Sequence, residues 1–168
     1  MVKKHSHCSY CGNKFEKPEW PRTCVSCNNI SYVNPLPVVA LVVPVLYEEH
    51  ATGVLTVRRK QNPESGKLAL CGGYMELGET WQEAGARELK EETGIIVDPD
   101  KIVLLDVGTS LASGSVLIFG EVIRPINITR LSSFKPNEEV LELVVLKEFE
   151  ELAFSTHTNA VKTYLGMR

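Results

Sequence analysis

Apolar runs of strand length alternate with polar turns along the chain that follows residue 37. Short runs of this kind, bounded by turn-forming residues, predict β-strands. The first two runs are separated by a polar segment that predicts a hairpin turn. The strands expected on this basis are Val38–Leu46, Gly53–Arg59, Leu68–Leu70, Lys101–Thr109, Ser115–Ile123 and Val140–Leu146.

One segment carries strong helical signals. Thr80 and Glu83 have the spacing of a capping box, and Gly94 stands where helices commonly end, so we expect a helix over Thr80–Thr93. A second helix is expected over Thr156–Leu165. Strands on both sides of one helix, with another helix at the end, predict an α/β (α+β) fold in which a mixed sheet lies between helices.

The beginning of the chain has a different character. Residues 1–34 are polar, contain four cysteines and lack helical periodicity. The prolines of Asn34-Pro35-Leu36-Pro37 stiffen the chain at this point. We therefore expect two domains, a small one over residues 1–34 and an α/β domain over residues 35–168.

Four of the five cysteines form two Cys-x-x-Cys pairs, Cys8 with Cys11 and Cys24 with Cys27. Two such turns can complete a closed tetrahedral shell of thiolates, which suits Zn²⁺. Binding of a structural zinc releases on the order of 10–16 kcal/mol, enough to order a short polar segment. The spacing predicts a zinc ribbon with a structural metal. A ribbon that binds nucleic acid is the alternative, and the modest basic content argues against it.

The predicted helix carries three glutamates that share one side. Glu88, Glu91 and Glu92 fall within an arc of about 100° on an α-helix. Carboxylates placed so closely repel one another, and their convergence is natural if hard divalent cations bind against that face. Arg87 is placed to pair with Glu91, and Gly73 lies in a flexible loop whose carbonyl can approach a metal.

Residues 73–95 match the signature of the Nudix hydrolase family. That pattern is Gly, five residues, Glu, seven residues, Arg-Glu, an aliphatic residue, any residue, Glu-Glu, any residue, Gly and an aliphatic residue. The resemblance implies a Nudix α/β/α sandwich with a mixed β-sheet, preceded here by a zinc ribbon. The residues that fill the pattern are Gly73, Glu79, Arg87, Glu88, Leu89, Glu91, Glu92, Gly94 and Ile95.

The resemblance also implies roles for these residues. Bound Mg²⁺ or Mn²⁺ would neutralise a diphosphate and lower the pKa of a water, and a carboxylate would take the proton of that water. Glu88 is the first candidate for the base, and Glu79 would support the site through a salt bridge with Arg87. The implied ligands of the catalytic metal are the Gly73 carbonyl, Glu88, Glu91 and Glu92.

Other charged residues are weaker candidates. In this family the base sometimes comes from a later loop, so Glu138, Glu139 and Glu142 are alternatives for the base or for a further ligand. Each of them could instead be a polar residue on the approach to a strand. Arg58 and Arg59 end the second predicted strand, where either could contact phosphate or be a plain surface charge.

The resemblance extends beyond the signature. A zinc ribbon, then Tyr-x-Asn-Pro at 32–35, then a Nudix domain is similar to the ribbon-bearing branch, which includes NADH pyrophosphatases and enzymes acting on ADP-ribose or FAD. Leu152-Ala153-Phe154-Ser155 resembles the ADP-ribose and FAD members. The Ser-Gln-Pro-Trp-type motif of the NADH group is absent. Cys71 stands where proline is more usual, and we expect a small buried residue rather than a nucleophile.

We therefore expect a Mg-dependent hydrolase of a nucleoside diphosphate derivative, with ADP-ribose or FAD favoured over NADH. Alternative substrates are a nucleoside triphosphate or a capped RNA end. A nucleotide- or RNA-sensing module that has lost catalysis is the alternative from another functional class, and the complete set of glutamates argues against it.

Composition and charge add few constraints. The net charge of −3 gives no reason to expect a nucleic-acid or membrane partner, although nucleic acid is not excluded. There is no apolar run of transmembrane length and no secretory leader at residues 1–7, so we expect a cytoplasmic protein. Many relatives pair, and we expect a homodimer.

Overall fold

The computed structural model describes residues 4–166. Residues 1–3 and 167–168 belong to the two expected domains and lie outside the described residues, and so does the beginning of the segment in which no secretory leader is expected. The chain separates into two compact units, Met1–Pro35 and Leu36–Arg168. No helix among residues 4–166 is both long enough and apolar enough to cross a lipid bilayer.

The first unit has little regular structure. Its strands β1 (Arg22–Thr23) and β2 (Ile30–Ser31) pair antiparallel. The Arg22 guanidinium lies 4.1 Å from the centre of the Trp20 ring and donates a hydrogen bond to the His5 carbonyl at 3.0 Å. Arg22 therefore joins parts of this unit that are distant in sequence, and its guanidinium contacts groups of the same unit.

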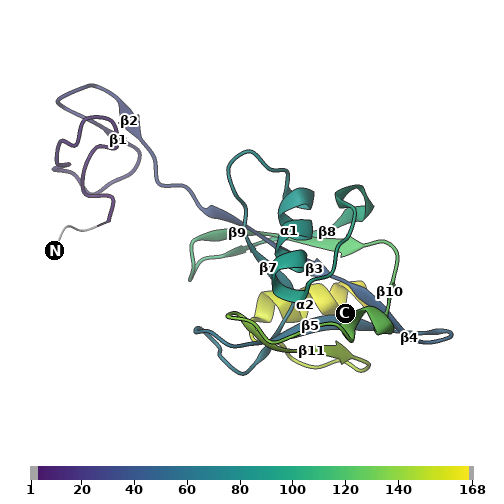
Figure 1. Cartoon of the computed structure of the whole chain (residues 1–168). Coiled ribbons are helices and arrows are strands. Elements are labelled where there is room, and N and C mark those ends of the chain that lie inside the picture. Colours follow the sequence, from purple (N-terminus) through teal and green to yellow (C-terminus); the bar gives the residue numbers. More distant parts are fainter. Residues whose placement is uncertain (1–3, 167–168) are drawn as a thin grey trace. The chain divides into compact units, whose positions relative to one another are not determined.

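The second unit contains two mixed sheets (Figure 1). One has the order β7-β3-β9-β8, in which β3 and β9 run parallel. The other has the order β10-β4-β5-β11, with β6 also paired to β5. The strands are β3 (Leu36–Val42), β4 (Pro44–Glu48), β5 (Ala51–Arg59), β6 (Leu68–Ala69), β7 (Cys71–Tyr74), β8 (Ile102–Ser110), β9 (Ser115–Val122), β10 (Ile126–Asn127) and β11 (Val140–Leu146). The helices are α1 (Trp81–Thr93) and α2 (Ser155–Tyr164), with 3₁₀ turns η1 (Pro99–Lys101) and η2 (Ile128–Leu131).

Helix α1 has the predicted ends. The Thr80 hydroxyl accepts a hydrogen bond from the Glu83 amide at 3.2 Å, and the Glu83 carboxylate accepts one from the Thr80 amide at 2.7 Å. Gly94 ends the helix at a φ of +76°, a conformation that glycine adopts without strain. The capping box and the terminating glycine are confirmed.

Residues 39–42 of β3 are buried on both faces of the sheet, between the two helices. Val39 and Leu41 belong to the core cluster that includes Leu89 of α1. Ala40 and Val42 belong to the other cluster, which includes Val161 of α2. Alternate side chains of a strand point to opposite faces, so this pattern gives the helix–sheet–helix layering expected of an α/β sandwich. The predicted fold class is confirmed.

The segment expected as one strand over Val38–Leu46 is divided. It forms β3 and β4, which belong to different sheets and meet at Val43. Pro44 has no amide hydrogen to donate, which favours a break in the ladder at this point. Val43 and Val45 on either side of Pro44 are also fully buried, so the chain stays apolar across the break. The apolar run alone therefore did not reveal the boundary between the two strands. The other predicted strands and the closing helix lie close to their expected bounds.

Candidate functional site

Glu92 is buried beside the strand that precedes α1. Glu92 is only 7% exposed, and its carboxylate accepts a hydrogen bond from the Gly72 amide at 3.0 Å. Burial, together with the negative charges of Glu88 and Glu139, raises the pKa of Glu92 to about 8. A buried carboxylate with like charges around it is a group that a bound cation would stabilise.

Gly73 lies in strand β7, so the flexible loop expected at this position is wrong, and Glu88 lies directly against the Gly73 backbone. A Cβ atom at Gly73 would stand 2.5 Å from Glu88 Oε1, so a larger residue there would require the carboxylate to move away from the backbone. Burial raises the pKa of the Glu88 carboxyl, while the neighbouring Arg87 acts in the opposite direction. Strand β7 and helix α1 therefore bring Glu88, Glu92 and the glycine backbone together, which is the arrangement that the signature predicts.

Arg87 ties the acidic face to the loop before the helix. Its Nε and Nη2 atoms donate to the two carboxylate oxygens of Glu79 at 3.1 and 2.8 Å. Nη1 donates to Glu88 at 2.8 Å and to Glu91 at 3.1 Å, and Nη2 also reaches the Tyr74 carbonyl at 2.9 Å. The expected Glu79–Arg87 ion pair is present, and hydrogen bonds from Arg87 lower the pKa of Glu79.

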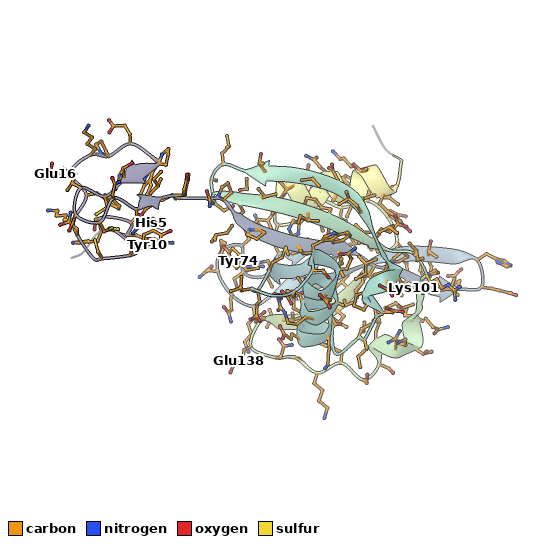
Figure 2. The ribbon with its side chains drawn as sticks, turned by 90° about the horizontal axis from the view of Figure 1, so that it is seen from above. His5, Tyr10, Glu16, Tyr74, Lys101 and Glu138 are labelled. Carbon is orange, nitrogen blue, oxygen red and sulfur yellow. The ribbon has the colours of Figure 1, made fainter. Side chains whose placement is uncertain are left out.

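A hollow of about 500 Å³ opens beside this face. Glu91 borders it from the solvent side, with 58% of its side chain exposed. Figure 2 shows Tyr74 and Glu138 on the same side of α1. Carboxylate oxygens, the donors that line it, are hard ligands suited to Mg²⁺ or Mn²⁺. The hollow is lined by Glu76, Arg87, Glu88, Glu91, Asn137, Glu138 and Glu139.

The loop before β11 is fastened to the end of α1 by Asn137. Its Nδ2 atom donates to the Glu92 carbonyl at 3.1 Å, and its Oδ1 atom accepts from the amides of Glu139 and Val140. This places Glu138 and Glu139 at the hollow. Sequence reasoning missed Asn137 and Glu76; an asparagine before a strand is a turn signal, but nothing in the sequence shows which helix it contacts.

The remaining charged candidates, Glu142, Arg58 and Arg59, lie in different surroundings. Glu142 lies outside the lining of the hollow and forms an ion pair with Arg58 at 2.6 Å across β11 and β5. Arg59 instead places its guanidinium 5.1 Å from the centre of the Phe154 ring, beside a second cavity. The two adjacent arginines therefore have different surroundings, and of the two only Arg59 lines the cavity that Gly72 and Gly73 of β7 also line.

Cys71 is fully buried at the start of β7. Burial raises the pKa of its thiol well above the usual value. A buried thiol held in its protonated form is a poor nucleophile, which agrees with the expectation of a small packing residue.

The four paired cysteines gather in the first unit. Their ligand atoms all lie within 4.8 Å of one another, with Sγ atoms 3.7 Å apart for Cys8 and Cys27 and 3.6 Å apart for Cys11 and Cys24. Tetrahedral zinc with Zn–S bonds of about 2.3 Å requires sulfur atoms about 3.8 Å apart. A disulfide requires about 2.05 Å. The sulfur spacing therefore fits Zn²⁺.

The backbone favours the thiolate at two of these cysteines. A hydrogen bond from the backbone at Asn29 lowers the pKa of Cys27 to about 6, and one from Tyr10 lowers that of Cys8. At Cys11 a hydrogen bond from the Asn13 backbone acts in the same direction, but the neighbouring Cys27 sulfur and burial outweigh it and raise the pKa to about 11. Among the residues that the structure describes, no other group of three or more His, Cys, Asp or Glu ligand atoms is gathered in this way.

Comparisons with known proteins agree with this geometry. Residues 35–158 match the model of the NUDIX domain. The chain is 56% identical over 43 residues to the ADP-ribose pyrophosphatase of Methanocaldococcus jannaschii, covering 26% of this chain and 25% of that protein. It is 30% identical over 97 residues to the NAD-capped RNA hydrolase NudC of Photorhabdus laumondii, covering 56% of this chain and 35% of that protein. The chain thus spans about a quarter to a third of the length of these curated relatives.

A solved structure is similar over nearly the whole length. The NUDIX hydrolase from Nitrosomonas europaea superposes with a TM-score of 0.71 at 28% sequence identity, covering 96% of this chain and 90% of that one. The family model covers most of the chain, and Glu88 and Glu92 of the signature lie together against Gly72 and Gly73 of β7. The chain belongs to the NUDIX domain family.

Proposed function

We propose that the chain is a divalent-cation-dependent pyrophosphohydrolase that cleaves the diphosphate link of a nucleoside diphosphate derivative. The observation that carries the proposal is the placement of Glu88 and Glu92, two carboxylates with raised pKa values, against the backbone of Gly72 and Gly73. Such an arrangement has no evident structural benefit, because two buried negative charges side by side oppose folding.

The residues fit a site for Mg²⁺ or Mn²⁺ held by Glu88, Glu91, Glu92 and the Gly73 carbonyl. When bound, such cations neutralise the diphosphate and lower the pKa of the attacking water. Arg87 holds Glu79, Glu88 and Glu91 in fixed positions, so the carboxylates would meet cations without first reorganising.

The base that accepts the water proton is proposed to be Glu88, with Glu138 and Glu139 as the alternatives from the loop. All three border the hollow, and a pKa raised by burial brings Glu88 closer to the value that suits a base at neutral pH. The ion pair between Glu142 and Arg58 makes Glu142 a weaker candidate than Glu139. Water would add to one phosphorus as the bridging P–O bond breaks, which gives two phosphate monoesters.

ADP-ribose is the favoured substrate and FAD the next. The identity to an ADP-ribose pyrophosphatase over 43 residues supports this choice, and the match to a NAD-capped RNA hydrolase supports a nucleotide that contains a diphosphate bridge. A capped RNA end and nucleoside triphosphates remain the alternatives to test. A cytoplasmic location and a homodimer stay predictions, which fractionation and light scattering would check.

The test is hydrolysis of a panel with millimolar Mg²⁺ and with EDTA. The panel contains ADP-ribose, FAD, NADH, a NAD-capped oligonucleotide and ATP. We expect Mg²⁺-dependent release of AMP from ADP-ribose, with a higher kcat/KM than for NADH or ATP. No hydrolysis of any member, with nucleotide still binding, would favour the sensing module instead.

A second proposal concerns the cysteines. We propose that Cys8, Cys11, Cys24 and Cys27 hold a structural Zn²⁺, because their sulfur spacing and their backbone hydrogen bonds fit a closed thiolate shell. Metal analysis of the purified chain should give one zinc per chain, and Cys27→Ser should lose it.

A further inference from the structure

The loop that precedes β11 takes its shape from the side chain of Asn137. Its Oδ1 atom accepts hydrogen bonds from the Glu139 amide at 2.9 Å and from the Val140 amide at 2.8 Å. The Asn137 amide donates in turn to the Val140 carbonyl at 3.0 Å. A side chain that bonds the backbone two residues further on fixes a turn, so Asn137 determines the path of the chain at Glu139.

The other end of the Asn137 side-chain amide bonds to α1. Its Nδ2 atom donates to the Glu92 carbonyl at 3.1 Å and lies 3.4 Å from the Glu91 carbonyl. Carbonyls in the last turn of a helix lack partners within the helix, so they can accept such a bond. Asn137 therefore joins the turn that carries Glu139 to two helix residues whose carboxylates belong to the signature.

Two residues that follow β5 bond to the carbonyls of the same loop. The Lys60 amide donates to the Glu139 carbonyl at 2.8 Å, and its Nζ atom donates to the Asn137 carbonyl at 2.9 Å. Gln61 Nε2 donates to the Glu138 carbonyl at 3.1 Å. The carbonyls of three consecutive loop residues are thus bonded, and the loop is held between α1 and the segment after β5.

These bonds oppose an electrostatic repulsion. Glu139 lines the acidic hollow together with Glu88 and Glu91. Burial is the main cause of the raised pKa of Glu88 and of Glu92, and the negative charge of Glu139 adds to it at both. Carboxylates placed in this way repel one another, so an exposed loop that was free to move would carry Glu139 away from the signature.

We propose that Asn137 is a positioning residue that holds Glu139 at the cation site, where the Glu139 carboxylate adds its charge to those of Glu88 and Glu92. The inference rests on the proposed cation-dependent function and adds to it a residue that acts through another side chain. Both ends of the Asn137 amide group are needed, because Oδ1 sets the turn and Nδ2 sets the distance of that turn from α1.

The test measures how much Glu139 contributes to cation affinity with Asn137 present and with Asn137 replaced. Mn²⁺ is the probe, and the EPR signal of free Mn²⁺ during a titration of the full chain gives the dissociation constant without any substrate. In the wild type, Glu139→Gln should weaken Mn²⁺ binding by at least about threefold at low ionic strength. In the Asn137→Ser background the same substitution should have little effect, because Glu139 has already moved away.

A second variant covers the case in which Asn137→Ser does not fold. Asn137→Asp keeps an acceptor for the two loop amides, and so the turn, but it has no donor for the Glu92 carbonyl. Its added charge is present whether or not Glu139 is replaced, so the effect of Glu139→Gln can be compared within this background. That effect should again be small.

Asn127→Ser is the matched control. The Asn127 side chain also accepts the amide hydrogen two residues further on, from Thr129 at 2.9 Å, but it lies in a turn outside the lining of the hollow. Glu139→Gln should keep its full effect on Mn²⁺ affinity in this background.

Two results would overturn the proposal. One is an effect of Glu139→Gln that is equal with Asn137 present and with Asn137 replaced. The other is Mn²⁺ binding by the wild type that is absent or that does not change with Glu139→Gln. Coupling between Asn137 and Glu139 in a chain that hydrolyses no diphosphate would sink the proposed hydrolysis and leave this inference standing, whereas turnover without coupling would do the reverse.

Discussion

Glu92 is a deeply buried carboxyl group, and neighbouring residues do not compensate the negative charge that it would carry when ionised. The Gly72 amide and Arg59 favour its charged form, but burial and the charges of Glu88 and Glu139 outweigh them. The pKa of about 8 therefore lies above the ordinary value of 4.5. At this scale the site is built at a cost in stability that bound cations would offset.

That cost predicts an unusual stability profile. Between about pH 4.5 and pH 8 the unfolded chain releases the Glu92 proton while the folded chain keeps it, so wild-type stability should fall as pH rises through this window. Glu92→Gln removes this dependence and keeps an acceptor for the Gly72 amide. We expect the variant to be more stable than the wild type by roughly 1–3 kcal/mol near pH 8 and nearly equal near pH 5.

Urea unfolding with EDTA at the two pH values measures this difference. A gain that is the same at both values would contradict the assignment to a buried carboxylate. Added Mg²⁺ should stabilise the wild type at the higher pH and have a much smaller effect on Glu92→Gln.

Part of the site could be predicted at the residue scale. The shared face of Glu88, Glu91 and Glu92 follows from helical geometry, and the Glu79–Arg87 pair follows from the family pattern. The different surroundings of Arg58 and Arg59 could not be predicted. Adjacent strand residues point to opposite faces, and only the partner strands decide what each face meets.

Helix α1 approaches β3 closely through Gly85. A Cβ atom there would stand 2.9 Å from Leu41 Cδ2 and 3.2 Å from Val39 Cγ1, and both residues are fully buried. The distance of α1 from the sheet determines where Glu88 and Glu92 contact Gly72 and Gly73 of β7. A small residue at this position therefore belongs to the construction of the site.

Gly85→Ala should consequently destabilise the fold. Alanine would favour the helix by about 1 kcal/mol in isolation, but overpacking a core typically costs about 1–3 kcal/mol. We expect a net loss of roughly 1 kcal/mol in chemical unfolding, with lower activity. Lys90→Ala, on the exposed side of the same helix, is the control and should change little. A stabilised Gly85→Ala would show that α1 can move away from β3.

Helix α2 is joined to the sheet through a neutral histidine. His157 is 8% exposed, accepts the Leu70 amide hydrogen, and has its pKa lowered by burial to about 4, below the ordinary 6.5. As pH falls through this window the unfolded chain takes up the proton first, so stability present above pH 6.5 is progressively lost toward pH 4.

His157→Asn keeps an acceptor and removes the titration. The wild type should lose on the order of 2–3 kcal/mol of stability across this window more than the variant does. Thermal unfolding at several pH values would check it. Parallel pH profiles for the two proteins would mean that His157 takes a proton without cost.

At the element scale, sequence patterns predicted the helices well and one strand boundary poorly. The capping box of α1 is local and is visible in the sequence. The division of Val38–Leu46 depends on which strands pair with each half. The second half, β4, pairs with the neighbouring β5, whereas the first half, β3, pairs with β9, which is distant in sequence. Local apolar runs do not contain that information.

On the scale of the whole molecule, the chain consists of two compact units, Met1–Pro35 and Leu36–Arg168. The buried side chains of the first unit include Cys8 and Cys24. Its stability should then depend on metal, whereas the second unit has an apolar core of its own.

Removal of zinc should unfold one unit and leave the other. With a zinc-selective chelator, we expect backbone amide signals of residues 4–35 to collapse to unfolded positions in NMR spectra. Signals of residues 36–166 should keep their dispersion. The chemical denaturation midpoint of the second unit should be unchanged. Loss of dispersion in both units would show instead that the ribbon is required for the Nudix domain to fold.

The measurement that tests the central claim most directly is AMP release from ADP-ribose as a function of Mg²⁺ concentration. The wild type, Glu88→Gln and Glu92→Gln would be compared with Glu150→Gln, an exposed control remote from the signature in sequence. We expect Mg²⁺-dependent turnover that falls by at least about 10²-fold in the first two variants and is unchanged in the control. Turnover that needs no divalent cation, or that survives both signature substitutions, would contradict it.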